Sequence, residues 1–438
     1  MVECGAARQL LCRRRRIGDW VMKITILSKF GSSLDLAMRL QAEENEVTLY
    51  TLTPEDADIG KGLVPIKTSL GGLNANLIIN DDVFLGETSD KLRKMGKVVL
   101  GGSSITDRLE NDREFGYNIM KACGIKVPKS EKFTDFDDGI DFVKKSKGTR
   151  YVFKPHGQKD RFFTHVAESA DEMIAMMEHY QNLWGDSQIT FELQEFVAGI
   201  EMAMGGWFNG EKFCKQVLPN FEFKKLMNGD IGPNTGEMGT VLCYRTHSKL
   251  YQETLAKTES FLKTANYKGF IDIACILTKD GAYGLEWTTR FGYPTIQIQD
   301  EVHKKDSWTK FLFKLAQGLT DEVPVDTAKW DVGVGICALP WPQKSGADKF
   351  KNTPVFMPDD VEHIHFDCMW LDGQQFRQAG SYGYICICTG SEVTIEKAKE
   401  NAYNVVDTVR VPGGFWRTDI ADRVLNDLPT LKSWGWIK

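Results

Sequence analysis

Apolar and polar positions between Met22 and about residue 103 alternate short β-rich runs with stretches of helical spacing. The runs "KITIL", "EVTLYTL", "NLIIND" and "KVVLGG" are typical of strands, whereas "LDLAMRLQAEEN" and "TSDKLRKMG" are typical of helices. Strands that alternate with helices in this way indicate a parallel sheet. We therefore expect an α/β domain with a parallel sheet over residues 22–105.

Helices and strands are expected along the rest of the chain as well. The pattern predicts helices near residues 109–123, 135–146, 169–184 and 251–266, and another at "TIEKAKENAYNVVDTV". Strands are expected at "RYVFKPHG", on both sides of Ala198-Gly199, in the hairpin "GFIDIACILTKDGAYGLEWTTRFG", and at "DVGVGICAL" and "YGYICICT".

The stretch "GDIGPNTGEMGTV" at residues 229–241 interrupts this pattern. It holds four glycines and one proline, a composition that argues against a regular helix and against a central strand. A surface turn is one interpretation. The other is a loop whose bare backbone approaches a ligand.

Composition narrows the function classes. The chain has 438 residues, enough for about three domains, and 42% of them are hydrophobic. Its net charge of -6 is spread over interleaved acidic and basic residues, so no nucleic acid or anionic membrane partner is expected. No apolar run approaches the length of a membrane span. A small-molecule substrate fits this balance best.

The chain start and the cysteines point to a cytoplasmic protein. Residues 1–21 contain "RRRR" without a following apolar segment, so we expect a disordered extension and no secretory signal. The ten cysteines are scattered and several lie in apolar runs, which predicts reduced, buried thiols. Cys386 and Cys388 share a strand face without other zinc ligands nearby. His363 and His365, near Asp367, could form a metal cluster, but their alternation favours the outward face of a strand.

The hairpin at residues 269–292 holds two carboxylates in otherwise apolar strands. With a two-residue loop at Asp280-Gly281, position 286 faces 275 and Asp272 points the other way. With a three-residue loop ending at Gly281 in a bulge, 272 pairs with 288. Asp272, Glu286 and Thr288 then line one face.

Two adjacent carboxylates repel each other unless a cation lies between them. Hard oxygen ligands select Mg²⁺ or Mn²⁺, while a lysine or arginine is the alternative. Arg290 follows on the same face as Thr288 and offers a fixed cation for a phosphate or carboxylate. This combination indicates nucleotide and metal chemistry.

Other residues fit the same interpretation individually. Lys154 ends an apolar strand, where it is either a solvated lysine or a contact to triphosphate oxygens. Glu195, Phe196 and Val197 leave a strand edge suited to an adenine, and Glu201 can hold ribose hydroxyls. The turn at Gly31 to Ser33 is either a phosphate cradle or a plain tight turn.

Taken together, these segments resemble the phosphoribosylamine-glycine ligase (glycinamide ribonucleotide synthetase) family of the ATP-grasp superfamily. The segments that carry the resemblance are "LGGSSITDRLENDREFGYNIMKACGIKVPKSEKFTDFDDGIDFV", "YVFKPHG", "LQEFVAGIEMAM", "GPNTGEMG", "YKGFIDIACIL", "LEWTTRFGYPTIQIQ" and "GGFWRTDIADRV". "GPNTG-x-MG" is the most specific. The resemblance spans nearly the whole chain from Met22.

The resemblance implies a fold, a reaction and roles for individual residues. It implies an ATP-grasp fold with a Rossmann-like N-terminal domain and a C-terminal α+β domain. ATP would phosphorylate a carboxylate to an acyl phosphate, which an amine would attack to give an amide, ADP and phosphate. Implied ATP contacts are Arg113, Lys154, Glu195, Phe196, Val197 and Glu201. Implied metal ligands are Asp272, Glu286 and Thr288, and implied catalytic residues are Arg290, Lys225, Asn234, Thr235 and Gly236.

Departures from the family pattern concentrate at the substrate positions. The glycine-rich turn with Arg-Glu-His that holds phosphoribosylamine in the family is "SKFGSSLDL" here, "GPEAPL" is "NDDVFL", and "RFGDPE" is "RFGYPT". The lid over the triphosphate is "GQKDRFFTHV", where Lys159 and Arg161 are candidate phosphate contacts or solvated loop charges. Glu237 replaces a second glycine. ATP and metal positions are largely kept.

We therefore expect a cytoplasmic ATP-dependent carboxylate-amine ligase with ATP and Mg²⁺ or Mn²⁺ as cofactors and an altered substrate pair. The alternatives are a divergent but genuine phosphoribosylamine-glycine ligase and a nucleotide-binding protein without catalysis. Expected domains are 22–105, an ATP-grasp domain at 106–324 with a lid subdomain at about 127–196, and 325–438. The expected oligomeric state is monomer or homodimer.

Overall fold

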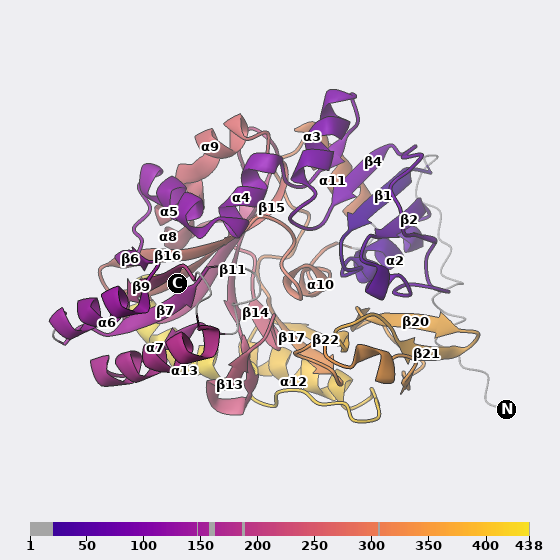
Figure 1. The fold of residues 1–438 in the computed structure, drawn as a ribbon. Coiled ribbons are helices and arrows are strands. Elements are labelled where there is room, and N and C mark those ends of the chain that lie inside the picture. The colour runs from indigo at the N-terminus through magenta and orange to yellow at the C-terminus, as the bar shows by residue number, and fades with distance from the viewer. Residues whose placement is uncertain (1–20, 147, 157–162, 186–188, 305–306, 438) are drawn as a thin grey trace.

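The computed structural model describes residues 21–146, 148–156, 163–185, 189–304 and 307–437. The predicted extension at 1–21 therefore lies outside the described residues except for Val21, and so do Lys159 and Arg161 of the lid. In Figure 1 the N-terminal domain lies on one side of a long central sheet, and a smaller α+β unit projects on the other.

The N-terminal domain is the expected parallel sheet. Its five strands run in the order β3-β2-β1-β4-β5, and every pairing is parallel. The order places β1 at the centre, where Ile24, Ile26 and Leu27 are almost fully buried. The elements are β1 (Lys23–Ser28), α2 (Leu34–Ala42), β2 (Glu46–Thr51), η1 (Pro54–Asp56), β3 (Ile66–Lys67), β4 (Leu77–Asn80), α3 (Gly86–Lys94) and β5 (Val99–Leu100).

The helix expected near residues 109–123 is in fact two helices, α4 (Ser104–Asn111) and α5 (Arg113–Ala122). Asp112 separates them with an extended backbone, and its carboxylate accepts a hydrogen bond from the Phe115 N–H at 3.1 Å. Aspartate is a strong N-cap because its side chain satisfies a free N–H of the first turn. Because of this break, Arg113 is the first residue of a new helix, α5.

A small α+β unit follows, with its own aromatic core. Its sheet has the order β6-β9-β7-β8, and one buried cluster contains Phe136, Phe153, Phe191 and Tyr180. Phe191 packs against Phe136 with ring centroids 4.9 Å apart. The elements are β6 (Ser130–Phe133), α6 (Phe136–Lys145), β7 (Tyr151–Pro155), β8 (His165–Val166), α7 (Ala170–Trp184) and β9 (Phe191–Glu195).

The central sheet is antiparallel and has eight strands in the order β16-β15-β10-β11-β14-β17-β22-β19. These strands are β10 (Ile200–Phe208), β11 (Phe213–Glu222), β14 (Gly239–Leu242), β15 (Gly269–Thr278), β16 (Gly281–Thr288), β17 (Trp330–Cys337), β19 (Ile364–Phe366) and β22 (Tyr384–Glu392). The domain boundary near residue 325 stays a prediction, but strands from both sides of it share this one sheet.

The remaining elements cover or extend this sheet. They are β12 (Lys225–Met227), η3 (Asn228–Asp230), β13 (Ile231–Asn234), α8 (Lys249–Glu253), η4 (Leu255–Thr258), α9 (Glu259–Thr264), α10 (Thr295–Gln299), α11 (Trp308–Gln317), η5 (Ala347–Lys349), β18 (Pro354–Val355), β20 (Met369–Asp372), β21 (Gln375–Gln378), α12 (Ile395–Val406) and α13 (Asp422–Ser433). The single helix expected at 251–266 is interrupted at Thr254, whose backbone is not helical. Its hydroxyl donates to the Leu250 carbonyl at 2.6 Å.

The glycine-rich stretch is only partly the irregular segment expected. Its end, Gly239 to Leu242, is a buried central strand between β11 and β17, so the expectation that it excludes a central strand is wrong there. A Cβ at Gly239 would lie 2.6 Å from the Gly333 carbonyl oxygen. Glycine at this position lets two strands approach, rather than breaking one.

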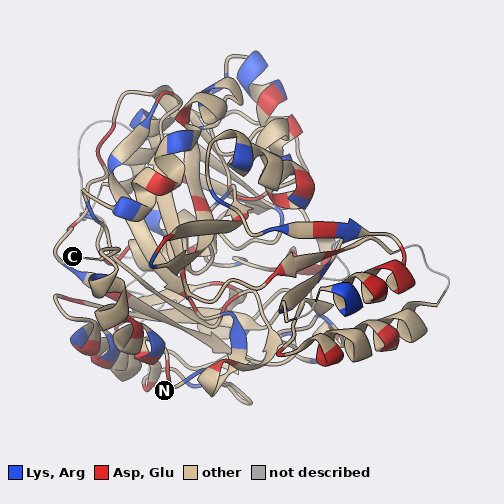
Figure 2. Ribbon diagram, turned by 90° about the vertical axis from the view of Figure 1, so that its left-hand side faces the viewer, with Lys and Arg blue, Asp and Glu red and all other residues tan. Residues whose placement is uncertain are grey.

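Charges and cysteines follow the sequence expectations where the structure describes them. Acidic and basic residues are interleaved over the ribbon in the view of Figure 2. Within the described residues no helix has the length and apolar character needed to cross a bilayer. The eight described cysteines are free thiols, and all but Cys123 are buried.

Candidate functional site

Asp272 and Glu286 lie on the same face of the central sheet. Asp272 pairs across the hairpin with Thr288, and Ala274 pairs with Glu286. Side chains alternate along a strand, so Asp272, Glu286 and Thr288 point the same way. The convergent register considered for this hairpin is confirmed.

The feature that sets this register differs from the expected one. Thr278 pairs with Gly281, so the turn is the two residues Lys279 and Asp280. Both loops considered from the sequence are therefore wrong, the two-residue loop at Asp280-Gly281 and the three-residue loop with a bulge at Gly281. The register shifts deeper in the hairpin, opposite Ala274 and Cys275, where Leu285 is the extra residue on β16. A bulge inserts one residue and thereby resets the alternation of side chains.

Neighbouring strands add polar groups to this face. Gly205 of β10 pairs with Asp272, and Ala203 pairs with Asn220 of β11. Period-two alternation then directs Glu201, Asn220 and Glu222 to the same side of the sheet. We call the resulting surface the acidic face; it consists of Glu201, Asn220, Glu222, Asp272, Glu286 and Thr288.

Lys224 neutralises much of the acidic face. Its Nζ lies 2.8 Å from Glu286 Oε1, 2.9 Å from Glu222 Oε2 and 3.7 Å from Glu201 Oε1. Burial lowers the pKa of Lys224, but the three carboxylates raise it further, so the net pKa lies well above its ordinary value. Lys224 lowers the pKa of Glu286 to about 2. In the sequence analysis, a lysine between the carboxylates was the alternative to a metal ion.

Asp272 is held differently, by an amide. Asn220 Nδ2 donates to Asp272 Oδ2 at 2.7 Å, and Asp272 is only 6% exposed. Burial, followed by the charge of Glu222, raises the pKa of Asp272 to about 8. The other amide atom, Asn220 Oδ1, is buried and has no hydrogen-bond partner among the described residues. A free oxygen next to a carboxylate is a ready cation ligand.

The acidic face fits a magnesium ion that is completed by other ligands. Among the described residues, no three His, Cys, Asp or Glu side chains are grouped as a metal site. Mg²⁺ in nucleotide enzymes is held by one or two carboxylates plus phosphate oxygens and waters, so a full protein cage is not required. Asp272, Glu286 and the partnerless Asn220 Oδ1 are hard oxygen donors of the kind it selects.

Arg113 and Lys154 carry positive charge toward Glu286. Arg113 Nη1 donates to the Pro155 carbonyl at 3.3 Å, and Lys154 Nζ donates to the Tyr117 hydroxyl at 3.4 Å. Both cations contribute, after Lys224, to the lowered pKa of Glu286. They also act on the nearly buried Glu192, which sits across the strand pair from Lys154. Two of the six residues predicted to contact ATP thus act on the acidic face.

The predicted adenine segment ends β9 at the joint between the small unit and the central sheet. The N–H groups of Glu195 and Phe196 already donate to the carbonyls of Lys129 and Arg150, at 2.8 and 2.9 Å. The Arg150 guanidinium stacks over the Phe196 ring at 4.0 Å. Val197 follows directly, beside the start of β10 that carries Glu201. The assignment of these residues to adenine and ribose remains a prediction.

Arg290 stands beside the acidic face among further carboxylates. Its guanidinium contacts Glu110 Oε1 at 3.2 Å and Asp82 Oδ1 at 3.7 Å. Burial lowers the pKa of Arg290, but Glu110 and Asp82 raise it more, so the net shift is upward. Burial raises the pKa of Asp82 to about 7. One arginine is therefore surrounded by more acid than it can neutralise.

The glycine-rich loop folds back over Lys224 through Thr235. The Thr235 N–H and hydroxyl both bond to the Lys224 carbonyl, at 2.7 and 2.8 Å. Asn234 pairs with Lys225 in the small sheet of β12 and β13, and Gly236 is exposed. The structure thus brings Lys224, not Lys225, against the carboxylates.

The terminal motif "FWRTDIADR" holds the start of this loop. Arg417 is 1% exposed and bonds to Asp230 Oδ1 at 2.7 Å and to Asp419 Oδ1 at 2.8 Å. Asp419 in turn accepts from the Gly229 N–H at 2.7 Å. Arg423 adds a contact to Asp230 at 3.1 Å. The sequence showed this motif without indicating that it anchors residues 229 and 230.

The turn after β1 is closed by hydroxyl and carboxyl groups. Gly31 has a positive φ of 77°, and its N–H donates to Ser28 Oγ at 2.9 Å. Ser33 Oγ lies 2.8 Å from the Tyr293 hydroxyl, which donates to Asp81 Oδ2 at 2.9 Å. Of the two interpretations, the geometry favours a tight turn.

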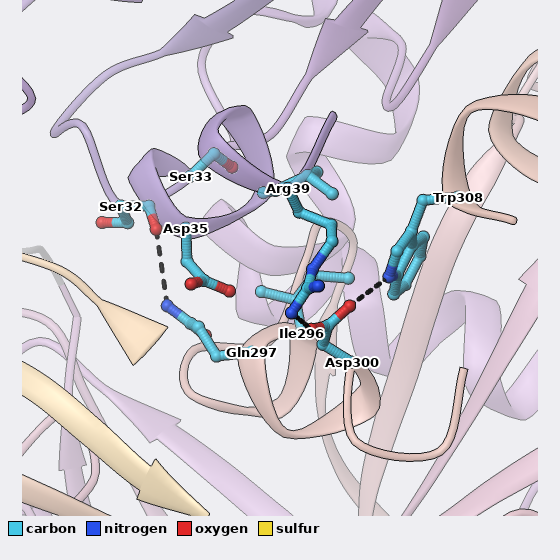
Figure 3. Close-up of a pocket in the computed structure, with 9 residues that line it drawn as sticks. Ser32, Ser33, Asp35, Arg39, Ile296, Gln297, Asp300 and Trp308 are labelled. Carbon is cyan, nitrogen blue, oxygen red and sulfur yellow. Dashed lines mark hydrogen bonds and ion pairs between the residues drawn. The ribbon is translucent and has the colours of Figure 1, made fainter. Parts of the chain in front are cut away.

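A pocket next to this turn is filled by the chain itself. Figure 3 shows Arg39 pointing from α2 to Asp300, with which it forms an ion pair, and Asp300 Oδ1 accepts from Trp308 Nε1 at 2.6 Å. Gln297 Nε2 donates to the Ser32 carbonyl at 3.4 Å. About 10 Å³ remains, close to the room for one water molecule. The arginine nearest the turn is therefore already committed to a carboxylate.

His365 corrects the expectation of an outward-facing pair. It is 1% exposed and contacts Asp35 Oδ2 at 3.0 Å and Glu301 Oε1 at 3.2 Å. Burial lowers the pKa of His365, but Asp35 and Glu301 raise it to about 10. Only His363 points toward solvent. His365 ties the N-terminal domain to the last strands of the central sheet.

Three site residues were missed at the sequence level: Asn220, Glu222 and Glu110. Lys224 and Lys225 were both recognised in the segment "EFKK", but Lys225 was chosen as the catalytic residue. Alternation through Asn220, Glu222 and Lys224 could have revealed the first two, because positions two apart on a strand share a face. Glu110 reaches Arg290 from a helix 180 positions earlier in the chain. Sequence spacing carries no signal for such a contact.

Comparison with known proteins agrees with the sequence motifs. Residues 111–296 match the family described as phosphoribosylglycinamide synthetase, ATP-grasp (A) domain. The phosphoribosylamine-glycine ligase of Streptococcus pneumoniae is 24% identical over 361 residues, covering 79% of this chain and 83% of that protein. That of Streptococcus suis is 24% identical over 442 residues, covering 92% and 100%.

Solved structures show the same fold. The phosphoribosylamine-glycine ligase of Thermotoga maritima superposes with a TM-score of 0.72 at 23% identity, covering 91% of this chain and 100% of that one. A biotin carboxylase domain of 2-oxoglutarate carboxylase from Hydrogenobacter thermophilus, in complex with MgADP and bicarbonate, gives 0.61 at 12% identity, covering 93% and 99%. Both likenesses establish the ATP-grasp fold. The chain therefore has the ATP-grasp fold, and its residues 111–296 match the ATP-grasp domain of the phosphoribosylglycinamide synthetase family.

Proposed function

We propose that this protein is an ATP- and magnesium-dependent ligase that joins a carboxylate to an amine through an acyl phosphate, on a substrate pair other than phosphoribosylamine and glycine. The acidic face and its flanking cations support the first part. The match of residues 111–296 to an ATP-grasp domain family and the likeness to a domain crystallised with MgADP support ATP and Mg²⁺ as cofactors.

The residues of the acidic face have separate tasks in this proposal. Asp272 and Glu286 hold the magnesium ion together with Asn220, and the bound ion offsets the charge of the phosphate oxygens. Lys154 and Arg113 approach the same place as phosphate-binding cations. Lys224 leaves Glu286 free for the metal by turning to Glu222 and Glu201, which it already contacts. Exclusion of water protects an acyl phosphate from hydrolysis.

One observation supports a substrate pair other than phosphoribosylamine and glycine. The turn after β1 meets Tyr293 at a place that is lined by carboxyl groups. Asp81 is fully buried, Asp82 lies next to it, and Ser33 and Tyr293 contribute only hydroxyls. The two arginines nearby, Arg290 and Arg39, are engaged by Glu110 and Asp300, and Lys29 of the same turn lies over the Phe84 ring at 3.8 Å. A phosphorylated acceptor would meet repulsion at this place.

ADP release tests the reaction class. Purified protein with Mg-ATP is incubated with a panel of small carboxylates, each alone and with a panel of primary amines. The proposal expects ADP and phosphate only when both a carboxylate and an amine are present, and Glu286→Gln abolishes turnover. ATP binding with no ADP from any pair would instead favour a nucleotide-binding protein without catalysis.

A genuine phosphoribosylamine-glycine ligase is the second candidate. Relatives with that name match up to 92% of the chain, which favours it. Phosphoribosylamine generated in situ, with glycine and Mg-ATP, should then give glycinamide ribonucleotide. Formation of that product at a normal rate would overturn the altered pair while leaving the ligase chemistry intact. A cytoplasmic location and a monomeric or homodimeric state remain predictions.

A further inference from the structure

Glu237 has a buried carboxyl oxygen that no described residue hydrogen-bonds. It lies between exposed Gly236 and the start of β14, its side chain is 4% exposed, and its Oε1 has no hydrogen-bond partner among the described residues. A buried polar group left without a hydrogen bond destabilises the folded state. Native proteins keep few such groups, and those they keep call for an explanation.

The backbone fixes the position of Glu237. The Met238 N–H donates to the Phe223 carbonyl at 2.8 Å, and the Met238 carbonyl accepts from the Gly335 N–H at 3.0 Å. The residue next to Glu237 is thereby tied to β11 on one side and β17 on the other. The carboxyl group is held in place rather than carried on a free loop.

Charged groups of the proposed reaction centre act on the carboxyl group of Glu237. The charges that act on it are Glu222 and Asp272, which oppose its ionisation, and Lys224 and Arg290, which favour it. These side chains come from β11, β15, the segment after β11 and the segment after β16. Glu237 is thus near the groups proposed to activate the carboxylate substrate, but hydrogen-bonded to none of them.

Aromatic rings border the same position. A Cβ at Gly236 would touch Trp341 Cη2 at 3.3 Å, and the Trp341 ring packs on Tyr384 with centroids 4.8 Å apart. The Tyr384 hydroxyl is buried, has no partner among the described residues, and is subject to the charge of Glu237. Aromatic faces next to a carboxylate are a suitable environment for an ammonium group.

We propose that Glu237 binds the amine substrate as an ammonium ion and accepts its proton, so that the acceptor is a cationic amine without a phosphate. This inference rests on the proposed ligase function. Asp82 and Glu110 contact Arg290, which also acts on Glu237, and with Asp81 they disfavour an anionic acceptor.

The step balances in protons and electrons. An ammonium proton passes to the Glu237 carboxylate, and the freed nitrogen lone pair attacks the carbonyl carbon of the acyl phosphate. A C–N bond forms, the C–O bond to phosphate breaks, and phosphate leaves with that electron pair. Burial and the charge of Glu222 raise the pKa of Glu237 well above its usual range, so the carboxylate form depends on the bound ammonium ion, with Lys224 and Arg290 acting in the same direction. Once ionised, it is a stronger base than an exposed carboxylate.

Two kinds of nucleophile, one uncharged and one cationic, separate this role from a structural one. Hydroxylamine is uncharged at neutral pH and traps an acyl phosphate without a base. Ethanolamine, putrescine and glycinamide are wholly or mainly ammonium ions at this pH and must lose a proton before they attack. Wild-type protein is first screened with Mg-ATP, hydroxylamine and a panel of small carboxylates for hydroxamate. Absence of hydroxamate from every carboxylate would count against the proposed function itself.

Glu237→Gln should keep hydroxamate formation but lose about 10²–10⁴-fold in amide formation at pH 7 with a charged amine. The lost rate should return as the pH approaches the pKa of the amine. Glu396→Gln, on the exposed side of α12, serves as the matched control. Equal loss with both nucleophiles, or no loss with either, would overturn the proposal.

Binding gives a readout that does not depend on turnover. Calorimetric titration of the protein with the same three amines should show at least one that binds wild type and Glu396→Gln equally, and Glu237→Gln at least ten times more weakly. If none of the amines binds, or if Glu237→Gln binds them as wild type does, the assignment of Glu237 to the ammonium group is wrong.

Discussion

Lys224 Nζ lies 2.8 Å from Glu286 Oε1, so a single ammonium group occupies the place next to a carboxylate predicted to hold magnesium. The same nitrogen reaches Glu222 on β11 at 2.9 Å. Without a metal ion, this lysine keeps the carboxylates of two strands from repelling each other. With a metal ion, it has a second carboxylate to which it can turn.

Replacing Lys224 should reduce catalysis more than replacing its neighbour. We expect Lys224→Met to lower kcat/KM for ADP release by about 10²–10³-fold, the cost of losing one preorganised charge at a reacting centre. Lys225→Met is the matched control and should lose less, because Lys225 pairs with Asn234 in the small sheet. A larger loss for Lys225 would restore the sequence-based assignment.

Asn220→Leu should raise the Mg²⁺ concentration that is needed for half-maximal ADP release. The substitution removes the amide that holds Asp272 and the free Oδ1 next to it. Loss of a residue that orients a ligand typically costs 10–100-fold in metal affinity. The Mg²⁺ concentration for half-maximal ADP release should rise by about that factor. An unchanged midpoint in a folded variant would contradict the metal assignment.

His365 should make stability depend on pH in the alkaline range. Its pKa is about 10 in the folded protein, against an ordinary value of 6.5, so the folded state binds the proton more tightly. The resulting stabilisation is complete below pH 6.5 and is lost as the pH rises through 10. Urea unfolding at pH 6, 8 and 10 measures this loss.

The variant His365→Gln should be less stable than wild type by about 3–5 kcal/mol at pH 7, because Asp35 and Glu301 lose a buried partner. Its stability should also change less between pH 7 and 10. His179→Gln, on the exposed face of α7, should leave both quantities unchanged. The prediction fails if His365→Gln keeps the wild-type pH dependence.

Arg417 should be required for the order of the glycine-rich loop. Arg417→Lys keeps the charge but loses the planar contacts to Asp230 and Asp419. We expect faster proteolytic cleavage within residues 228–237 and a lower melting temperature. Arg410→Lys, whose guanidinium lies over the Phe356 ring, is the comparison variant. Cleavage at the wild-type rate in Arg417→Lys would argue against an anchoring role.

Much of the fold could be predicted from the sequence, because its strands and helices follow their own periodicity. The parallel sheet of the N-terminal domain is one example, and the shared face of Asp272 and Glu286 follows from one of the two registers considered for the hairpin. The predictions that were wrong concern features that depend on tertiary contacts. Leu285 carries no signal of a bulge, and His365 alternates like a surface residue although its partner Asp35 lies 330 positions away. Asp112 and Thr254 break helices through their own hydrogen bonds, which hydrophobic spacing does not reveal.

The neighbours of β14 have a consequence for dividing this protein. β14 is hydrogen-bonded to β11 on one side and to β17 on the other, and β17 lies beyond residue 325. A fragment ending at the predicted boundary would expose the backbone of Gly239 to Leu242 as a free, apolar edge, which is a template for pairing between molecules. Such a fragment should aggregate, so the segment 325–438 protects the rest of the chain from self-association.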